Sequence, residues 1–273
     1  MMNKQHTYLI NGGTDDAVSA LDRGLNYGDG VFRTFQVVDC VPVNWPIQYQ
    51  KLVADCGAIG IVCPSAELLM ADFQVLFAID EAAVAKVMIT RGIGERGYAP
   101  PAVTTPTRIV LKSPMPVYAE TNFSEGVSLY VCKTPVAHQP MLAGIKHLNR
   151  LENVLARAES LDPVYVDGLM LDVDGHVIEC TSANFFIRIG KRLITPDVTQ
   201  AGVAGVTRQR IVDLAHYLQL TAEIGHIRLS DVLSADEVII CNSLYGAWQV
   251  RRIGDTHWPA GSLAHDLREL LKV

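Results

Sequence analysis

The stretch GIKHLNRLENVLARAE, from Gly144 to Glu159, joins two different sequence patterns. Its second half repeats apolar residues at helical spacing and predicts an amphipathic helix. These residues are Leu148, Leu151, Val154, Leu155 and Ala158. Its first half places Lys146 between the largely apolar residues 141–145 and the start of that helix. Apolar neighbours and the positive end of a helix dipole both favour an uncharged amine, which is the form that bonds to an aldehyde. The alternative is an ordinary solvated lysine.

The composition indicates a folded, acidic protein. Of the 273 residues, 49% are hydrophobic and 19% are charged, which supplies a sizeable core and excludes disorder for most of the chain. The net charge of -6 and the lack of a basic stripe argue against nucleic-acid binding. Local Arg or Lys groups would have to hold an anionic ligand against this overall charge. We therefore expect a small molecule, and no nucleic acid, as the partner.

The cysteines and the apolar runs predict a cytoplasmic protein without membrane contact. None of the six cysteines forms a CxxC pair, so we expect reduced, buried thiols. The N-terminal sequence MMNKQHTYLINGG lacks the apolar core of a signal peptide. No uninterrupted apolar segment is long enough to span a bilayer. No His/Cys/Asp cluster has zinc spacing, so no metal site is predicted.

Hydrophobic periodicity predicts a mixed α/β fold with two domains. The first half mixes strands at 7–10, 31–38, 41–45, 85–90 and 107–111 with helices at 48–59 and 65–79. The second half has strands at 127–132, 168–172, 177–180, 184–189 and 237–241, with helices after residue 146, at 207–220 and at 262–271. Few periodic apolar positions fall in 114–126, which predicts a linker between domains 1–113 and 127–273. We expect the ligand site in the cleft between these two α/β domains.

Three further stretches could surround a ligand. Glu179 follows an apolar run and could present a carboxylate to a cation, or lie on an exposed hairpin. Val206 and Thr207 open a helix after two glycines, so N–H groups and a hydroxyl could bind an anion there, or Thr207 could cap its own helix. Asn242 and Ser243 end a strand, where they could close an anion site or form a turn.

Together these groups form the set needed to hold pyridoxal 5'-phosphate. Its aldehyde would bond to Lys146, its ring nitrogen would pair with Glu179, and its phosphate would lie at the helix that starts near Thr207. Nucleotide binding is weakly indicated, because the glycine-rich stretch DRGLNYGDGVFRTF lacks GxGxxG spacing and the chain contains no Walker-type Gly-Lys-Ser/Thr. No Gly-x-Ser-x-Gly elbow of a hydrolase is present either.

Five motifs resemble the fold-type IV family of pyridoxal-phosphate enzymes. In order they are DRxxxYGDGxF, IKHLNRLENVL, GxVxExxxxNxF, GVxGxTR and CNSL, and they cover nearly the whole chain. Within this family, AGIKHLNRLENVL and the loop TRGIGERGY are most similar to the aminodeoxychorismate lyases. The resemblance implies a two-domain α/β fold, a homodimer, and conversion of 4-amino-4-deoxychorismate to 4-aminobenzoate and pyruvate in folate synthesis.

The resemblance also implies roles for residues within the motifs. Lys146 would bond to the cofactor and then remove the substrate proton, and Glu179 would keep the pyridine nitrogen protonated. The phosphate would be held by Val206, Thr207, Asn242 and Ser243. The family usually adds an arginine from the first helix of the N-terminal domain, where this chain offers Lys51 instead. A lysine gives a point charge and not the fork of an arginine.

Weaker analogies concern the substrate. Tyr98 and Arg108 are predicted to bind its carboxylates, and Thr34 is predicted to assist proton delivery. A loop aromatic, a surface arginine and a strand threonine are the ordinary alternatives. D-amino-acid and branched-chain transaminases have the same cofactor site, so a transaminase is the alternative activity. The former usually carry an apolar residue in place of Arg150. A cofactor-binding relative without catalysis is the third possibility.

Overall fold

The computed structural model describes residues 7–14 and 17–272, and these divide into two compact units. Unit 1 contains the described part of Met1–Pro116 together with Ile145–Asn149. Unit 2 contains Val117–Gly144 and the described part of Arg150–Val273. The sequence placed Lys146 in the second domain, whereas its segment packs with unit 1. The first residues of predicted domain 1–113 lie outside the described residues, and its boundaries stay a prediction.

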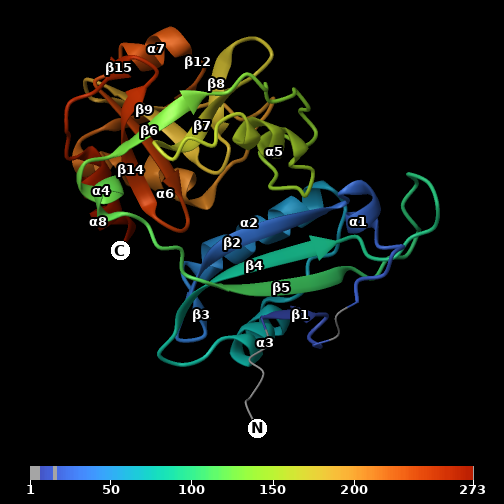
Figure 1. Cartoon of the computed structure of the whole chain (residues 1–273). Coiled ribbons are helices and arrows are strands. Elements are labelled where there is room, and N and C mark those ends of the chain that lie inside the picture. The colour runs from blue at the N-terminus through green and yellow to red at the C-terminus, as the bar shows by residue number, and fades with distance from the viewer. Residues whose placement is uncertain (1–6, 15–16, 273) are drawn as a thin grey trace. The chain divides into compact units, whose positions relative to one another are not determined.

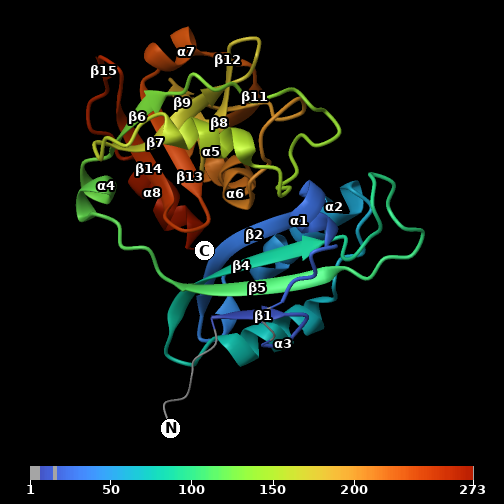
Figure 2. The same ribbon diagram turned by 45° about the vertical axis from the view of Figure 1, so that its right-hand side comes forward.

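Unit 1 is built on a five-stranded antiparallel sheet in the order β1-β5-β4-β2-β3. Its strands are β1 (Tyr8–Ile10), β2 (Gly30–Val38), β3 (Val41–Pro42), β4 (Ala82–Thr90) and β5 (Thr107–Pro114). Its helices are α1 (Arg23–Tyr27), α2 (Trp45–Ala58) and α3 (Ala66–Leu76). Strands β2, β4 and β5 lie side by side in Figures 1 and 2.

Alternation along β2 explains the core of unit 1. Arg33, Phe35 and Val37 are buried, whereas Phe32 and Thr34 are only partly covered. Successive side chains of a strand point to opposite faces, so one face of this sheet packs on the core of unit 1 and the other carries Phe32 and Thr34. The predicted strand at 31–38 is confirmed, and the predicted helices at 48–59 and 65–79 appear as α2 and α3.

The predicted strand at 41–45 is wrong beyond Pro42. Helix α2 already begins at Trp45, with Pro46 in its first turn. Proline is favoured there because its fixed φ suits the helix and its missing N–H would be unpaired anyway. Helix α3 starts at the expected point, where the side chain of Ser65 accepts a hydrogen bond from the N–H of Leu68.

Unit 2 contains a ten-stranded mixed sheet in the order β11-β10-β9-β13-β14-β6-β7-β8-β12, with β15 paired to β14. The strands are β6 (Val127–Val131), β7 (Tyr165–Leu171), β8 (His176–Cys180), β9 (Asn184–Ile189), β10 (Arg192–Pro196), β11 (Thr221–Gly225), β12 (Ile227–Arg228), β13 (Glu237–Asn242), β14 (Gly246–Ile253) and β15 (Thr256–His257). The helical segments are α4 (Glu120–Ser124), α5 (Leu151–Ala158), α6 (Val206–Leu214), the 3₁₀ segment η1 (Ala215–Leu218), α7 (Leu229–Leu233) and α8 (Leu263–Leu271).

Both faces of the central strands of unit 2 are buried. Phe185 and Phe186 of β9 are adjacent in sequence and belong to two different apolar clusters. The side of Phe186 is covered by α6 and α8, which contribute Ile211 and Leu267. Such strands lack a polar face. The predicted linker at 114–126 contains the short helix α4. Among the described residues, no helix is both long and apolar enough to cross a membrane.

Candidate active site

The segment that carries Lys146 is extended and lies along the edge of β2. The N–H of Phe32 donates to the carbonyl of Lys146 at 2.9 Å, and the N–H of Leu148 donates to the carbonyl of Gly30 at 2.9 Å. His147 forms an antiparallel bridge with Val31. Helix α5 therefore starts only at Leu151, and the predicted position of Lys146 at a helix start is wrong. Because the backbone bonds to β2, the helix dipole does not act on this amine as predicted.

Two lysine side chains place their Nζ atoms near the ring of Phe32. The Nζ atom of Lys146 lies 4.7 Å from the ring centroid, and the Nζ atom of Lys86 lies 5.0 Å from it. Lys86 stands opposite Thr34 in the β2–β4 ladder. Phe32 and Thr34 share a face of the sheet. This face therefore brings together the predicted residues Lys146 and Thr34, and it adds Lys86, which was not predicted. The alternation of β4 was the signal that could have identified Lys86.

Glu179 is buried in unit 2. It lies on β8 and is only 4% exposed, so the interpretation as an exposed hairpin residue is wrong. Its Oε2 atom accepts a hydrogen bond from the N–H of Val203 at 3.0 Å. A buried carboxylate needs such partners, because burial without them is costly. The loop at Gly202 lies against this group, since a Cβ atom there would come within 3.6 Å of the carboxyl carbon of Glu179.

Helix α6 starts where the anion site was predicted, and the anion site itself stays a prediction. The N-cap of this helix is Gly205, which has no side chain to accept hydrogen bonds from the first N–H groups. The hydroxyls of Thr207 and Ser243 lie 3.2 Å apart. Asn242 is turned to its own loop, where its Oδ1 accepts from the N–H of Leu244 at 3.0 Å. The structure therefore brings Thr207 and Ser243 together beside the helix start.

The loop that leads into α6 is held from three sides. Besides its contact with Glu179, it receives a hydrogen bond from Asn184, whose Nδ2 donates to the carbonyl of Val203 at 2.8 Å. The N–H of Gly144 donates to the carbonyl of Gly202 at 2.9 Å. A Cβ atom at Gly205 would come within 2.0 Å of Asn184. Glycine is thus required at position 205 by close packing.

Lys51 has a carboxylate partner inside unit 1. Its ammonium forms an ion pair with Asp55, one helical turn further along α2. The other oxygen of Asp55 receives a hydrogen bond from Arg33 at 3.1 Å. Burial lowers the pKa of Arg33, and the charge of Asp55 opposes that effect. The contact of Lys51 with phosphate stays a prediction. In that contact the ammonium group of Lys51 would bind the phosphate and Asp55 at the same time.

The two predicted substrate ligands differ in exposure. Arg108 is 8% exposed and is paired through two nitrogens with Asp72. It is therefore not the surface arginine that the sequence also allowed. The side chain of Tyr98 is 86% exposed, and its ring lies 5.4 Å from that of Tyr27. A role of Arg108 toward substrate stays a prediction and requires the guanidinium to share Asp72.

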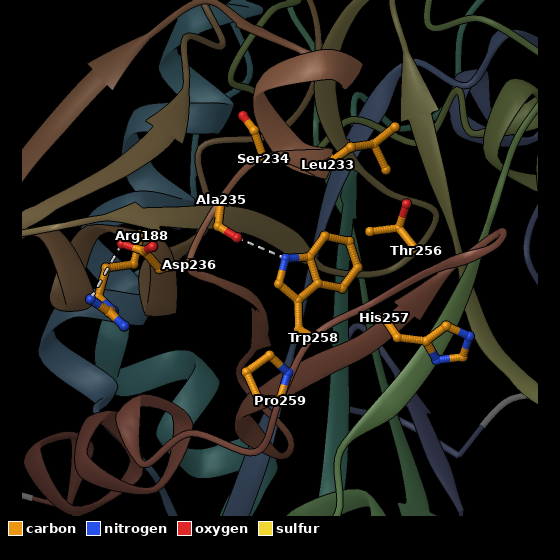
Figure 3. Close-up of a pocket in the computed structure, with 9 residues that line it drawn as sticks. All are labelled: Arg188, Leu233, Ser234, Ala235, Asp236, Thr256, His257, Trp258 and Pro259. Atoms are coloured by element: carbon orange, nitrogen blue, oxygen red, sulfur yellow. Dashed lines mark hydrogen bonds and ion pairs between the residues drawn. The ribbon is translucent and has the colours of Figure 1, made fainter.

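Two other polar sites in unit 2 lie apart from the predicted residues. A shallow pocket of about 590 Å³ is lined by groups that include Arg188, Asp236 and Trp258 (Figure 3). Near the β7–β8 turn, His138, Asp172 and Asp174 have possible metal ligands within 4.8 Å of one another. The Oδ2 atom of Asp172 lies 2.9 Å from Nε2 of His138, so hydrogen bonding accounts for this cluster. These three residues are separated in sequence, which is why spacing did not reveal the cluster.

Comparison with known proteins identifies the class. The chain belongs to the family described as amino-transferase class IV, whose pattern matches residues 30–253. Its two α/β units and this match confirm the predicted family and fold class.

Individual members of this family are similar over most of their length. A 4-amino-4-deoxychorismate lyase from Pseudomonas aeruginosa is 39% identical, with a TM-score of 0.92 over 97% of this chain and 98% of that chain. An aminodeoxychorismate lyase from Vibrio harveyi is 33% identical over 265 residues, or 96% of this chain and 98% of the relative. A putative branched-chain-amino-acid aminotransferase from Methanocaldococcus jannaschii is 30% identical over 229 residues, or 83% and 79% of the two chains.

Proposed function

We propose that this protein is a pyridoxal-phosphate-dependent carbon–oxygen lyase that converts 4-amino-4-deoxychorismate to 4-aminobenzoate and pyruvate. The observation that carries the proposal is the 39% identity to the Pseudomonas aeruginosa lyase over 97% of this chain and 98% of that one. The Vibrio harveyi relative with the same activity in its name supports it. The proposed place of this activity is folate synthesis.

The residues present fit pyridoxal phosphate. The start of α6 offers N–H groups of Val206 and Thr207, and a second hydroxyl from Ser243, to a phosphate. The buried carboxylate of Glu179 is suited to a protonated ring nitrogen. Its hydrogen-bond donor Val203 lies in the loop that also leads to α6. Asn242 would close the phosphate site, and Lys51 would add a positive charge.

Chain connectivity supports a role of Lys146 at the same site. Gly144 forms a bridge with Val203 in the loop before α6. Lys146 follows two residues later, and two residues span at most about 7 Å. We propose, as the family resemblance implies, that Lys146 and Glu179 act on one cofactor.

The proposed chemistry divides between the two units. When bound, pyridoxal phosphate supplies an aldehyde that bonds to amines and a ring that accepts an electron pair. Lys146 removes the proton from the substrate carbon that bears nitrogen, the adjacent C–O bond breaks, and the three-carbon group leaves as enolpyruvate, which takes up a proton to give pyruvate. Glu179 holds a proton on the ring nitrogen. Thr34 assists the proton transfer from its place on the face that carries Phe32.

A small anionic substrate suits the charges of unit 1. The ammonium of Lys86 lies near the same ring as that of Lys146, so it can attract a carboxylate to this face. Tyr98 and Arg108 remain the proposed further ligands of the carboxylates.

We also propose a cytoplasmic homodimer. Helix α5 packs Ala156 inward, whereas its predicted apolar stripe is turned outward. The exposed fractions of Leu151, Val154 and Leu155 are 70%, 60% and 54%. A second copy of the chain would cover this stripe. All six cysteines are free thiols, which suits a reducing compartment.

A transaminase acting on branched-chain or D-amino acids is the second candidate. The relative from Methanocaldococcus jannaschii, at 30% identity, favours it. Both candidates use the same lysine, carboxylate and phosphate site, and they differ in the groups that select the substrate.

One experiment separates the two candidates. The purified protein, supplied with pyridoxal phosphate, is given 4-amino-4-deoxychorismate, and release of pyruvate and 4-aminobenzoate is measured in equal amounts. A parallel assay measures amino transfer from branched-chain and D-amino acids to 2-oxoglutarate. Product in the first assay and none in the second supports the lyase. Transfer without pyruvate release would replace it with the transaminase, and inactivity in both assays with bound cofactor would indicate a non-catalytic relative.

A further inference from the structure

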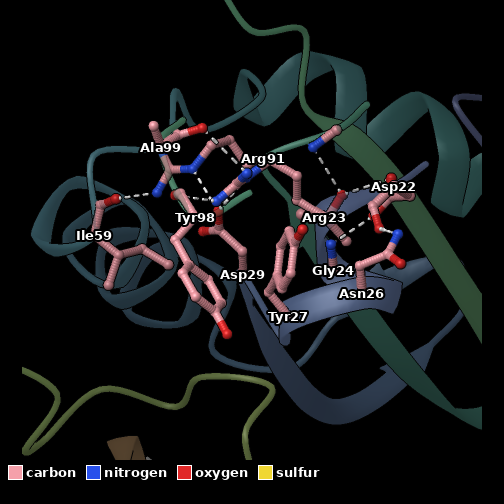
Figure 4. Close-up of polar contacts among 12 residues, drawn as sticks. Asp22, Arg23, Gly24, Asn26, Tyr27, Asp29, Ile59, Arg91, Tyr98 and Ala99 are labelled. Carbon is pink, nitrogen blue, oxygen red and sulfur yellow. Dashed lines mark hydrogen bonds and ion pairs between the residues drawn. The ribbon is translucent and has the colours of Figure 1, made fainter. Parts of the chain in front are cut away.

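The loop that carries Tyr98 is held by one arginine. This loop connects β4 and β5, and it is the stretch TRGIGERGY and the residues after it. The guanidinium of Arg23 donates to three consecutive carbonyls, those of Gly97 at 3.0 Å, Tyr98 at 2.8 Å and Ala99 at 3.4 Å. Figure 4 shows these contacts converging from the loop onto the one side chain. A single group thereby fixes the backbone on both sides of Tyr98.

The guanidinium of Arg23 is itself fixed. Its side chain is 5% exposed, and its Nε donates to Asp29 at 2.8 Å. Arg91 donates to the same oxygen of Asp29 at 2.7 Å. Burial raises the pKa of Asp29, but the hydrogen bonds from Arg91 and Arg23 outweigh it and the pKa is lowered. The carboxylate thus stays ionised and orients the fork of Arg23 toward the loop.

Backbone contacts also join the segment of Arg23 to the loop. The N–H of Arg23 donates to the carbonyl of Gly92 at 2.8 Å, and Asp22 bridges Ile93. A Cβ atom at Gly94 would come within 2.8 Å of the Arg23 side chain, so glycine is required for the arginine to pass. Asp22 is tied to the sheet, because its Oδ2 accepts from the hydroxyls of Thr90 and Thr107.

The ring of Tyr98 is placed by Tyr27, the last residue of α1. The hydroxyl of Tyr27 accepts a hydrogen bond from the N–H of Gly97 at 3.1 Å, and the two rings lie 5.4 Å apart. Arg23 also lies over the Tyr27 ring, 4.9 Å from its centroid. The two rings project from the same side of the polar network in Figure 4. The loop backbone is therefore fixed while the Tyr98 side chain is 86% exposed and open to a ligand.

We propose that Arg23 is a positioning residue for substrate binding: it holds the carbonyls of Gly97, Tyr98 and Ala99 so that Tyr98 meets a carboxylate-bearing ring substrate. The inference rests on the proposed function, since it concerns the substrate of that site. An ordered loop binds substrate without first losing conformational entropy, so this role appears in KM. Arg23 takes no part in the proton transfer, which Lys146 carries out, so kcat should not depend on Arg23.

The test uses Arg23→Lys in the full-length protein with pyridoxal phosphate. Lysine keeps the positive charge for Asp29 but cannot reach three carbonyls with a planar fork. We expect KM for 4-amino-4-deoxychorismate to rise about tenfold while kcat changes less than about twofold, because hydrogen bonds from a charged group are lost only from the loop. Arg192→Lys is the control for the exchange of arginine by lysine, because the guanidinium of Arg192 pairs with Glu223 in unit 2 and none of its described hydrogen bonds reaches this loop.

A second measurement needs no substrate. Arg96 precedes the held carbonyls and lies in an exposed part of the loop, so trypsin cleavage after it reports loop opening. We expect cleavage at Arg96 to be about tenfold faster in Arg23→Lys and unchanged in Arg192→Lys, with equal thermal stability of both. Unchanged cleavage, or faster cleavage with an unchanged KM, would overturn the proposal. If the wild-type protein transfers amino groups and releases no pyruvate, the proposed function fails. The role of Arg23 is then still decided by the KM for the amino-acid substrate together with the rate of cleavage at Arg96.

Discussion

Lys146 and Glu179 are the two central residues of the proposed chemistry, and the protein holds them in different ways. Lys146 belongs to a short segment without regular structure, which backbone hydrogen bonds join to β2. Its ammonium lies against the face of Phe32. Glu179 belongs to β8, next to the edge strand β12 of the sheet of unit 2, is almost completely buried, and accepts a hydrogen bond from Val203. The contacts described for Lys146 fix its backbone, whereas those for Glu179 fix its carboxylate as well.

This difference corresponds to the work proposed for each group. An amine that bonds, releases and moves a proton needs side-chain freedom on a fixed backbone. A carboxylate that only stabilises charge works best when it is preorganised. The comparison predicts that loss of the Lys146 amine removes both the bond to the cofactor and the proton transfer, whereas changes in the packing around Glu179 affect cofactor affinity.

The largest effect is expected from Lys146→Ala. Loss of the amine removes both the covalent bond to the cofactor and the proton transfer, so kcat should fall by at least about 10³-fold. The visible absorbance of lysine-bound cofactor should also disappear from the spectrum of the purified protein. Lys86→Ala is the matched control, since its ammonium lies at nearly the same distance from the Phe32 ring. Lys86→Ala should keep that absorbance. If Lys146→Ala kept both its turnover and its visible absorbance, the assignment of Lys146 as the cofactor-bound lysine would be refuted.

A smaller loss is expected from Glu179→Gln. The amide keeps an oxygen for the N–H of Val203, so cofactor should remain bound. It cannot hold the ring nitrogen protonated as a carboxylate does, and kcat should fall about 10²-fold. Steady-state kinetics with cofactor in excess measures this. An unchanged kcat would contradict the proposed role.

The start of α6 can be disturbed without touching a polar group. In Gly205→Ala the new Cβ atom would come within 2.0 Å of Asn184, whose amide supports the loop at Val203. We expect affinity for pyridoxal phosphate to fall about tenfold, measured by titration of the apoprotein. Gly225→Ala is the control in the same unit, because no atom lies within 4 Å of a Cβ atom there. Equal affinities of the two variants would show that the packing at position 205 is unimportant.

The smallest effect concerns stability. The pKa of Asp172 is lowered, because hydrogen bonds from His138, from backbone N–H groups and from His176 outweigh burial, which raises it. A carboxyl group whose pKa is lower in the folded than in the unfolded protein stabilises the fold at pH values above the unfolded pKa, which is about 3.9 for Asp. This contribution to stability is lost as the pH falls through the pKa of the folded state. Asp172→Asn should therefore cost about 1 kcal/mol at pH 7. In urea unfolding, the difference from wild type should shrink below about pH 4; a difference that grew there would contradict the assignment.

Much of the fold was predictable because local patterns and long-range packing agree. Hydrophobic periodicity at 31–38 and 65–79 identified β2 and α3 within a few residues. Strands β10, β11, β12, β14 and β15 were not predicted. Two of them are only two residues long. Strands β10 and β14 form hairpins with β9 and β13, and β11 pairs in parallel with β10, so their existence depends on these partners as well as on local propensity.

The site was predicted to a different extent in its two halves. The glycines before Thr207 identified a helix start, and the structure confirms α6 there. Lys146 was selected for its apolar approach and a helix dipole, and the dipole argument was wrong because the segment pairs with β2. Lys86 was not selected at all, although the alternation of β4 places it at a partly covered position opposite Thr34.

The sequence by itself determined the residue types, the strand alternation and the five motifs that identify the family. Only the tertiary structure decided that Lys146 lies over Phe32, that Glu179 is buried, and that Arg23 holds the loop of Tyr98. The reason is physical: these arrangements depend on hydrogen bonds and packing between residues tens of positions apart, and each residue alone is compatible with several surroundings.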